Sequence, residues 1–234
     1  MNGKFALFAV VVLISAAGCN MNSHAGPTQT SREEIDAGTA KSVRAEIHMG
    51  AGDLRLEAGG EKLLTADFRC SESLGLPIVQ YGVTDNTGRL TVKSPKEGSS
   101  ARNTVNNWTL RIGSQLPLDA TVDVGAGKAN LDLSKLSLRS LEIHMGAGEL
   151  QLNLAGKYTQ DVPVKISSGV GEARIRLPKD IGAVVSAISG IGQVSANGLT
   201  QRDGKYYNSA YVEGKPAVRL DMSGGVGQVT LSVE

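Results

Sequence analysis

The hexapeptide Ile-His-Met-Gly-Ala-Gly occurs twice in the chain, at Ile47–Gly52 and at Ile143–Gly148. A glycine-rich turn beside a histidine can form a phosphate-binding loop or supply part of a metal site. A phosphate loop needs a helix after its glycines, because the amides at the start of that helix bind the anion. Asp53–Leu56 instead continues in the polar–apolar alternation of a strand. The sequence therefore disfavours a phosphate-binding role.

The two histidines offer a second possibility. By strand alternation His48 and His144 point away from the core, and Asp123 lies between them if each glycine turn marks one layer of a repeat. These groups could begin a surface metal site, but no third and fourth ligand is evident. We expect a solvated polar ladder in which His–Asp pairing stabilises the strands slightly. Neither a metal nor a cofactor is predicted.

The chain has two cysteines, and the first follows an apparent targeting signal. Lys4 precedes the apolar run Phe5–Ala17, which is too short to span a bilayer comfortably. The small residues that lead into Cys19 resemble a bacterial lipobox, although alanine stands at the usual leucine position. We predict a signal peptide over residues 1–18 and lipidation of Cys19; the alternative is ordinary secretory cleavage after Ala17 or nearby, which leaves a free Cys19. Asn20, where some lipoproteins carry an inner-membrane aspartate, favours the outer membrane.

With Cys19 lipidated, Cys70 has no disulfide partner. It lies in a strand-like run, and we expect a small buried side chain rather than a nucleophile, because no neighbouring base is apparent.

Composition favours an all-β fold. The 234 residues include 29 glycines but only 4% aromatic residues, which indicates many short strands joined by tight turns. The 24 basic and 23 acidic residues nearly cancel, so the strongly basic balance of nucleic-acid-binding proteins is absent. No nucleic-acid partner is predicted.

A repeat explains the glycine turns. Six Gly-x-Gly turns occur, and the four from Gly125 to Gly190 are 21, 23 and 21 residues apart. Relative to the first glycine, the positions three before and four and six after are apolar in every copy, which predicts an inward face. The predicted structural turns are Gly50 and Gly52, Gly125 and Gly127, Gly146 and Gly148, Gly169 and Gly171, Gly190 and Gly192, and Gly225 and Gly227. We predict a right-handed β-helix-like solenoid of short strands over residues 41–234 as a single domain, preceded by a flexible tether over residues 19–40.

The central third of the chain resembles the toast-rack family of bacterial envelope domains. The matching features are Trp108, Leu116–Leu118, Gly125–Gly127, the Leu138–Leu141 link and Gly146–Gly148. The C-terminal part also resembles the related adhesin domains. The resemblance covers roughly residues 41–234 and implies a β-helix-like stack, with kinship to domains of membrane proteins that respond to cell-wall-active antibiotics. Those relatives carry a multi-span membrane segment, and we expect a lipid anchor to take its place here. The family has no agreed catalytic residues, so none is transferred.

Three functions remain open. The favoured one is a non-catalytic, membrane-anchored lipoprotein of the bacterial envelope, outer-membrane or periplasm-facing, that binds a protein, glycan or lipid partner, with cell-envelope stress response as one setting. The second is a structural or adhesin-like surface spacer. The third is a polysaccharide-active solenoid enzyme, which needs carboxylates that converge on adjacent rungs, that is, on successive layers of the repeat. The outward column of Asp53, Lys128, Glu149 and Glu172 is mixed in sign and predicts ion pairing between rungs instead.

A tyrosine-rich segment lies between the last two glycine turns. Tyr206, Tyr207 and Tyr211 follow the Asp203-Gly204 turn. Tyrosines are favoured at interfaces, so these residues could contact a partner. A solenoid's last rung also leaves its core open, and the same side chains could serve as a cap.

Overall fold

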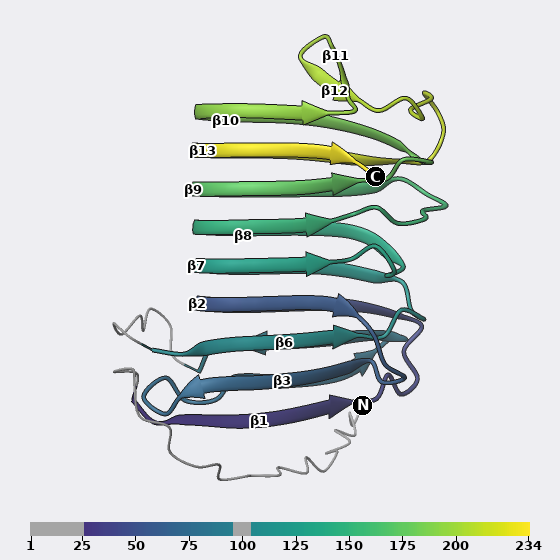
Figure 1. Cartoon of the computed structure of the whole chain (residues 1–234). Coiled ribbons are helices and arrows are strands. Elements are labelled where there is room, and N and C mark those ends of the chain that lie inside the picture. Colours follow the sequence, from purple (N-terminus) through teal and green to yellow (C-terminus); the bar gives the residue numbers. More distant parts are fainter. Residues whose placement is uncertain (1–25, 96–103) are drawn as a thin grey trace.

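The computed structural model describes residues 26–95 and 104–234, and these form thirteen strands and no helix. The all-β prediction is confirmed. The strands join into one large mixed sheet (Figure 1). They are β1 (Thr28–Ile35), β2 (Ser42–Ala58), β3 (Leu64–Ser71), β4 (Ile78–Thr84), β5 (Thr87–Lys93), β6 (Asn106–Ile112), β7 (Leu118–Asp132), β8 (Leu138–Asn153), β9 (Val162–Leu177), β10 (Gly182–Asn197), β11 (Thr200–Arg202), β12 (Lys205–Tyr207) and β13 (Ala217–Val233).

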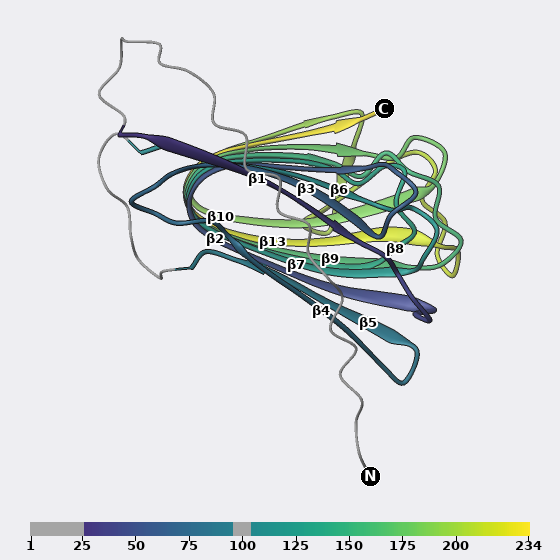
Figure 2. The same ribbon diagram turned by 90° about the horizontal axis from the view of Figure 1, so that it is seen from below.

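The repeat forms the centre of this sheet. Its six strands are 15 to 17 residues long. Each bends back on itself at its Gly-x-Gly, so that two arms face each other across the core (Figure 2). Neighbouring strands are parallel and in register, with Gly52 opposite Gly127 and Gly127 opposite Gly148. Lys128 accordingly lies opposite Glu149, as the repeat alignment predicts.

The order of the strands differs from the order of the repeats in the chain. The sequence of neighbours is β2-β7-β8-β9-β13-β10, so the C-terminal strand lies between β9 and β10. At matched inward positions β13 carries the larger side chains, with Leu220 opposite Val185 of β10 and Leu231 opposite Ala196. Placing the larger side chains between two neighbours buries more apolar surface than leaving them at the end of the stack.

The bend accepts little other than glycine. Gly127 has φ 125°, and a Cβ there would collide with the carbonyl oxygen of Gly52 in the strand below. At Gly125 the backbone is ordinary, but a Cβ would collide with the carbonyl oxygen of Gly50. Close approach of neighbouring backbones, rather than ligand binding, therefore accounts for the repeated glycines.

One rung lacks a glycine bend, and it occupies the long gap after Gly50. β5 pairs in parallel with the first arm of β2, and β6 pairs in parallel with its second arm. Together they form a rung whose bend is replaced by a longer connection, part of which (96–103) lies outside the described residues. Two side chains flank the break: Ser94 Oγ accepts a hydrogen bond from Gly50 N at 3.2 Å, and Asn106 Nδ2 donates to Ala51 O at 2.5 Å. These two side chains form hydrogen bonds with backbone groups of the β2 bend, which the backbone of an uninterrupted neighbouring strand would otherwise pair with or cover.

The N-terminal end of the sheet is antiparallel. β1 pairs with β3 over its whole length, from Thr28 opposite Ser71 to Ile35 opposite Leu64. The predicted tether over residues 19–40 is therefore wrong for the part that forms β1. This strand is held mainly by the backbone ladder, and Ser31 is its one buried residue, so no hydrophobic period reveals it. The predicted signal peptide and Cys19 lie outside the described residues.

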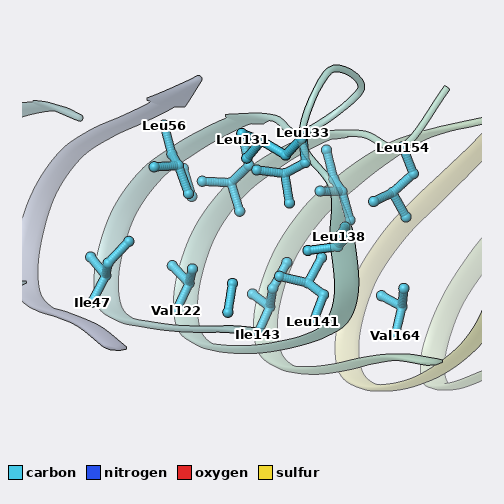
Figure 3. Close-up of a cluster of buried hydrophobic side chains, with 14 of the residues drawn as sticks. Ile47, Leu56, Val122, Leu131, Leu133, Leu138, Leu141, Ile143, Leu154 and Val164 are labelled. Atoms are coloured by element: carbon cyan, nitrogen blue, oxygen red, sulfur yellow. The ribbon is translucent and has the colours of Figure 1, made fainter. Parts of the chain in front are cut away.

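The core fills the space between the two arms. Figure 3 shows Ile47, Val122 and Ile143 on one arm facing side chains of the other arm. The predicted column of Leu131, Leu152 and Ile175 is buried, with at most 2% of each residue exposed. At the N-terminal end Trp108 and Phe68 meet edge to face, with ring centroids 5.7 Å apart. The glycine bends thus hold a continuous apolar core inside and leave a regular polar surface outside.

Candidate functional site

An open groove of about 670 Å³ runs along the outside of the bends. It crosses β7, β8, β9 and β13, which are consecutive neighbours in the sheet. Three strand spacings of about 4.8 Å give it a length of about 14 Å. Four of its polar side chains come from one position of the repeat, two residues before the first glycine: Asp123, His144, Ser167 and Ser223. Ser168, one residue before Gly169, also lines the groove. The glycines Gly125, Gly146 and Gly169 form part of its lining, so backbone is accessible between these side chains.

The side chains of this column interact only in part. His48 Nδ1 lies 2.6 Å from Asp123 Oδ2, which forms the predicted His–Asp pair between β2 and β7. His144 also neighbours Asp123 in the strand register, but its Nε2 lies 3.4 Å from Glu142 within its own strand. The hydroxyl oxygens of Ser167 and Ser223 are 3.4 Å apart. The arrangement is a ladder of half-exposed hydrogen-bonding groups, which can contact an elongated ligand that lies across the strands.

Metal chemistry finds no support in this ladder. Within residues 26–95 and 104–234, no group of three or more His, Cys, Asp or Glu side chains is placed to hold a metal ion. His48 and Asp123 pair with each other, and His144 turns toward Glu142.

A second outward column lies on the other side of the bends. Lys128 Nζ is 3.7 Å from Glu149, and the Arg174 guanidinium contacts both Glu149 at 2.5 Å and Glu172 at 2.7 Å. A hydrogen bond from Gln151, together with the nearby Arg174, holds the pKa of Glu149 below its usual value. Glu149 is therefore a stable carboxylate paired with cations. Ion pairing between rungs is confirmed at Lys128–Glu149, and a carboxylate paired in this way is poorly suited to serve as a general acid.

Cys70 is buried and is the one free thiol among the described residues. Its Sγ donates to Asn106 Oδ1 at 3.3 Å, and burial raises the pKa of the Cys70 thiol to about 11. Because the thiolate is the nucleophilic form, this side chain is inert near neutral pH. The predicted structural role of Cys70 is confirmed.

Two of the three tyrosines belong to β12, which lies at the far end of the stack from β1 (Figure 1). Tyr206 pairs with Val185 of β10 and packs against the core. The rings of Tyr207 and Tyr211 are 4.9 Å apart, and the Arg202 guanidinium lies 4.7 Å from the Tyr207 ring. All three are half-buried. The geometry is compatible with an end cap that leaves part of each ring accessible.

Sequence reasoning missed the asparagine that fixes this end. Asn208 is buried, and its Nδ2 donates to the carbonyl oxygens of Pro178 and Ile181, both at 2.8 Å. Its Oδ1 accepts from Ala183 N at 2.8 Å. Asn208 thus holds the returning chain against the start of β10. Its position directly after the tyrosine pair was visible in the sequence, but a buried asparagine has no pattern that distinguishes it from a loop residue.

The described residues contain no helix that is long and apolar enough to cross a membrane. The predicted attachment through Cys19 concerns residues that lie outside the described part of the chain.

The bent parallel strands, their glycine column and the outer groove define an all-β repeat protein. The chain belongs to the toast-rack family, because residues 24–176 match the N-terminal domain of toast_rack, DUF2154. A solved structure of a candidate cell adhesion protein from Clostridium sporogenes is 31% identical, with a TM-score of 0.86, over 89% of this chain and 100% of that one.

More distant solved structures include candidate adhesins from Bacteroides fragilis and Parabacteroides merdae. The first is 14% identical with a TM-score of 0.31, over 88% of this chain and 97% of its own. The second is 16% identical with a TM-score of 0.26, over 88% of this chain and 96% of its own. These scores are too low to support an argument. The search of curated proteins found no match.

Proposed function

We propose that the protein is a lipid-anchored, non-catalytic module of the bacterial envelope that binds a protein, glycan or lipid partner through the groove over the bends. The observation that carries this proposal is the similarity to the candidate cell adhesion protein of Clostridium sporogenes. This similarity extends over the full length of that protein. The groove supports it, since each of its four strands offers at least one hydrogen-bonding side chain.

The same proposal includes the finer features of the fold and location. The stack would be a right-handed β-helix-like solenoid, because crossovers between parallel strands are overwhelmingly right-handed. The N-terminal lipid would hold this solenoid at a membrane facing the periplasm or the cell exterior. A setting in the response to envelope stress rests on the family resemblance alone.

Two alternatives differ from this proposal in what the groove does. A structural or adhesin-like spacer needs the rigid stack but no contact through Ser167 and Ser223. A polysaccharide-active enzyme would need free carboxylates on adjacent rungs, whereas Glu149 and Glu172 both contact Arg174. The binding module is favoured because the groove brings outward side chains from four consecutive strands together beside glycines of the bends.

The test blocks the groove without changing the core. A Ser167→Arg, Ser223→Arg double variant places two long cationic side chains across the floor, and both parent serines are at least partly exposed. The matched control is Ser134→Arg, Ser209→Arg, at two loop serines that do not line the groove. Cells that display each variant at equal level are measured for attachment to isolated cell-wall sacculi, to lipid vesicles and to protein-coated surfaces.

The binding module predicts that attachment to one of these surfaces falls to background in the groove variant and is retained in the control. Equal attachment by both variants would favour the spacer. Release of soluble sugar from the sacculi by the wild-type protein would favour the enzyme.

A further inference from the structure

The last long strand of the stack, β10, is covered over only part of its length. On one side it pairs with β13 from Gly182 to Asn197. On the other side, β12 pairs with Val184 and Val185 alone. Among the described residues, no strand pairs with the outer edge of the second arm, and Figure 1 shows the β11–β12 hairpin over one end of β10 only. We call the segment Gln193–Asn197 the open arm.

The core beneath the open arm is incompletely closed. Val194 and Ala196 are only partly buried. Their register partners in β13, Val229 and Leu231, are 6% and 0% exposed. The same two positions in the other glycine-bend rungs are occupied by residues at most 4% exposed: Leu54, Leu56, Ala129, Leu131, Leu150, Leu152, Ala173 and Ile175. Val194 and Ala196 therefore lack the covering strand that closes the core over the same two positions of the other rungs.

The edge also lacks the features that usually prevent strand addition. Gly182–Asn197 contains no charged residue and no proline, whereas exposed edges are commonly protected by charges, prolines or bulges. β1, at the other end of the sheet, carries Arg32, Glu33 and Glu34. The two ends of one sheet thus differ in their protection, and the unprotected end is also the one with an incompletely covered core.

We propose that the open arm binds an extended segment of a partner polypeptide, which adds to the sheet as a further strand. The groups left unmatched here are backbone amides and carbonyls at strand spacing, and another extended backbone is their natural complement. The segment would carry apolar side chains at alternate positions, to cover Val194 and Ala196, and would need no net charge, because Gln193, Ser195 and Asn197 are neutral. This surface is separate from the groove over the bends, and its use does not depend on the function proposed for that groove.

The chain itself supplies a matched probe. β13 pairs with the opposite side of the open arm, with Val229 beside Val194 and Leu231 beside Ala196. A peptide with the sequence of Gly227–Val233, GQVTLSV, therefore has the spacing and side chains that this strand already accepts in parallel pairing. Hydrogen exchange is measured on the full chain with and without excess peptide, and binding is followed by fluorescence anisotropy of the labelled peptide.

Strand addition predicts saturable binding and about tenfold slower exchange of those open-arm amides that face away from β13. The peptide that carries Leu231→Lys should fail to bind the wild-type protein, because it places a charge over Ala196. A Val194→Lys protein should also lose binding. Val212→Lys, at a valine that is 55% exposed in the loop before β13, should retain it.

Three results would overturn the proposal. The first is the absence of strand addition. It would appear either as no peptide binding at all, or as unchanged hydrogen exchange of the open-arm amides at peptide concentrations that saturate the anisotropy signal. The second is faster exchange within Gly227–Val233 of the protein, which would mean that the peptide displaces β13. The third is self-association of the protein through this arm that the peptide cannot compete with, since the occupant would then be a second copy. The lysine-bearing peptide leaves the protein unaltered, so it keeps the test valid if Val194→Lys does not fold.

Discussion

Replacing Asn106 by alanine is expected to lower the free energy of unfolding by about 3 kcal/mol. The side chain bonds three groups around the rung that lacks a glycine bend: Nδ2 donates to Ala51 O, and Oδ1 accepts from Trp108 Nε1 at 2.7 Å and from Cys70 Sγ at 3.3 Å. Trp108 is 1% exposed, so its indole N–H would be left without a partner and beyond the reach of water. A buried donor without a partner costs about 1–3 kcal/mol, and the lost bond to Ala51 O adds about 0.5–1.5 kcal/mol.

The assay is guanidinium unfolding, supported by thermal melts. For a chain of this size about 3 kcal/mol corresponds to a decrease in Tm of about 6–12 °C. Asn107→Ala is the matched control, because its side chain is the exposed neighbour in the same strand. In a Trp108→Phe background the effect of Asn106→Ala should shrink, since the indole N–H is then absent. If Asn106→Ala and Asn107→Ala differ by less than about 0.5 kcal/mol, Asn106 does not stabilise the interrupted rung and the reasoning is refuted.

Further predictions concern the core, the anchor, the thiol and the cap. Leu152→Asp should prevent folding, because it puts an unpaired charge into a site that is 2% exposed; a cooperative melt at the wild-type temperature would contradict the repeat register. Cys19→Ala should move the protein from the membrane to the soluble fraction, and unchanged partitioning, or an unmodified start at Gly18 in mass spectrometry, would argue against lipidation. Because burial raises the pKa of Cys70 to about 11, iodoacetamide should label this residue at pH 8 only after unfolding; rapid labelling of the native protein would contradict its burial. Tyr206→Ala combined with Tyr207→Ala should lower Tm if the tyrosines cap the stack, whereas an unchanged Tm with lost partner binding would make them a contact surface.

The sequence predicted the structure within each rung because several local requirements coincide there. At Gly127 a side chain is excluded by the neighbouring backbone, and apolar residues follow at Ala129 and Leu131 to fill the core. Close backbone contacts and core packing therefore require the same spacing between the glycines and the following apolar residues in each copy of the repeat. The pairing of Lys128 with Glu149 followed directly from that spacing.

The order of the rungs could not be predicted in the same way. Every rung with a glycine bend carries the same glycine register, so β9 would match β10 as well as it matches β13. Which strand becomes the neighbour depends on how much apolar surface each placement buries and on whether the connection can reach. Here the Asn208 network holds the chain that returns from β12 toward β13. Such long-range choices leave no periodic signal along the chain.

The groove was also hidden from the sequence in part. The outward position two residues before each first glycine was recognised, but not which side chain follows Ser167 in the groove. Ser223 follows it because β13 rather than β10 lies beside β9. The extent of the site therefore depends on the order of the rungs. A residue far along the chain joins the ladder only once that order is fixed.

Separation of the core from the outer surface is what makes this architecture suited to binding. At the bends the glycines fix how closely strands approach, and inward residues such as Val122 and Ile143 hold the core. The outward position two residues before each glycine bears neither constraint, so it can change from histidine to aspartate or serine while the strand register is kept. A ligand that lies across the strands meets one such side chain about every 4.8 Å. The side chains that contact the ligand can therefore be changed one rung at a time while the core is kept. This freedom favours a partner-binding surface over a site that must keep several catalytic groups in one fixed geometry.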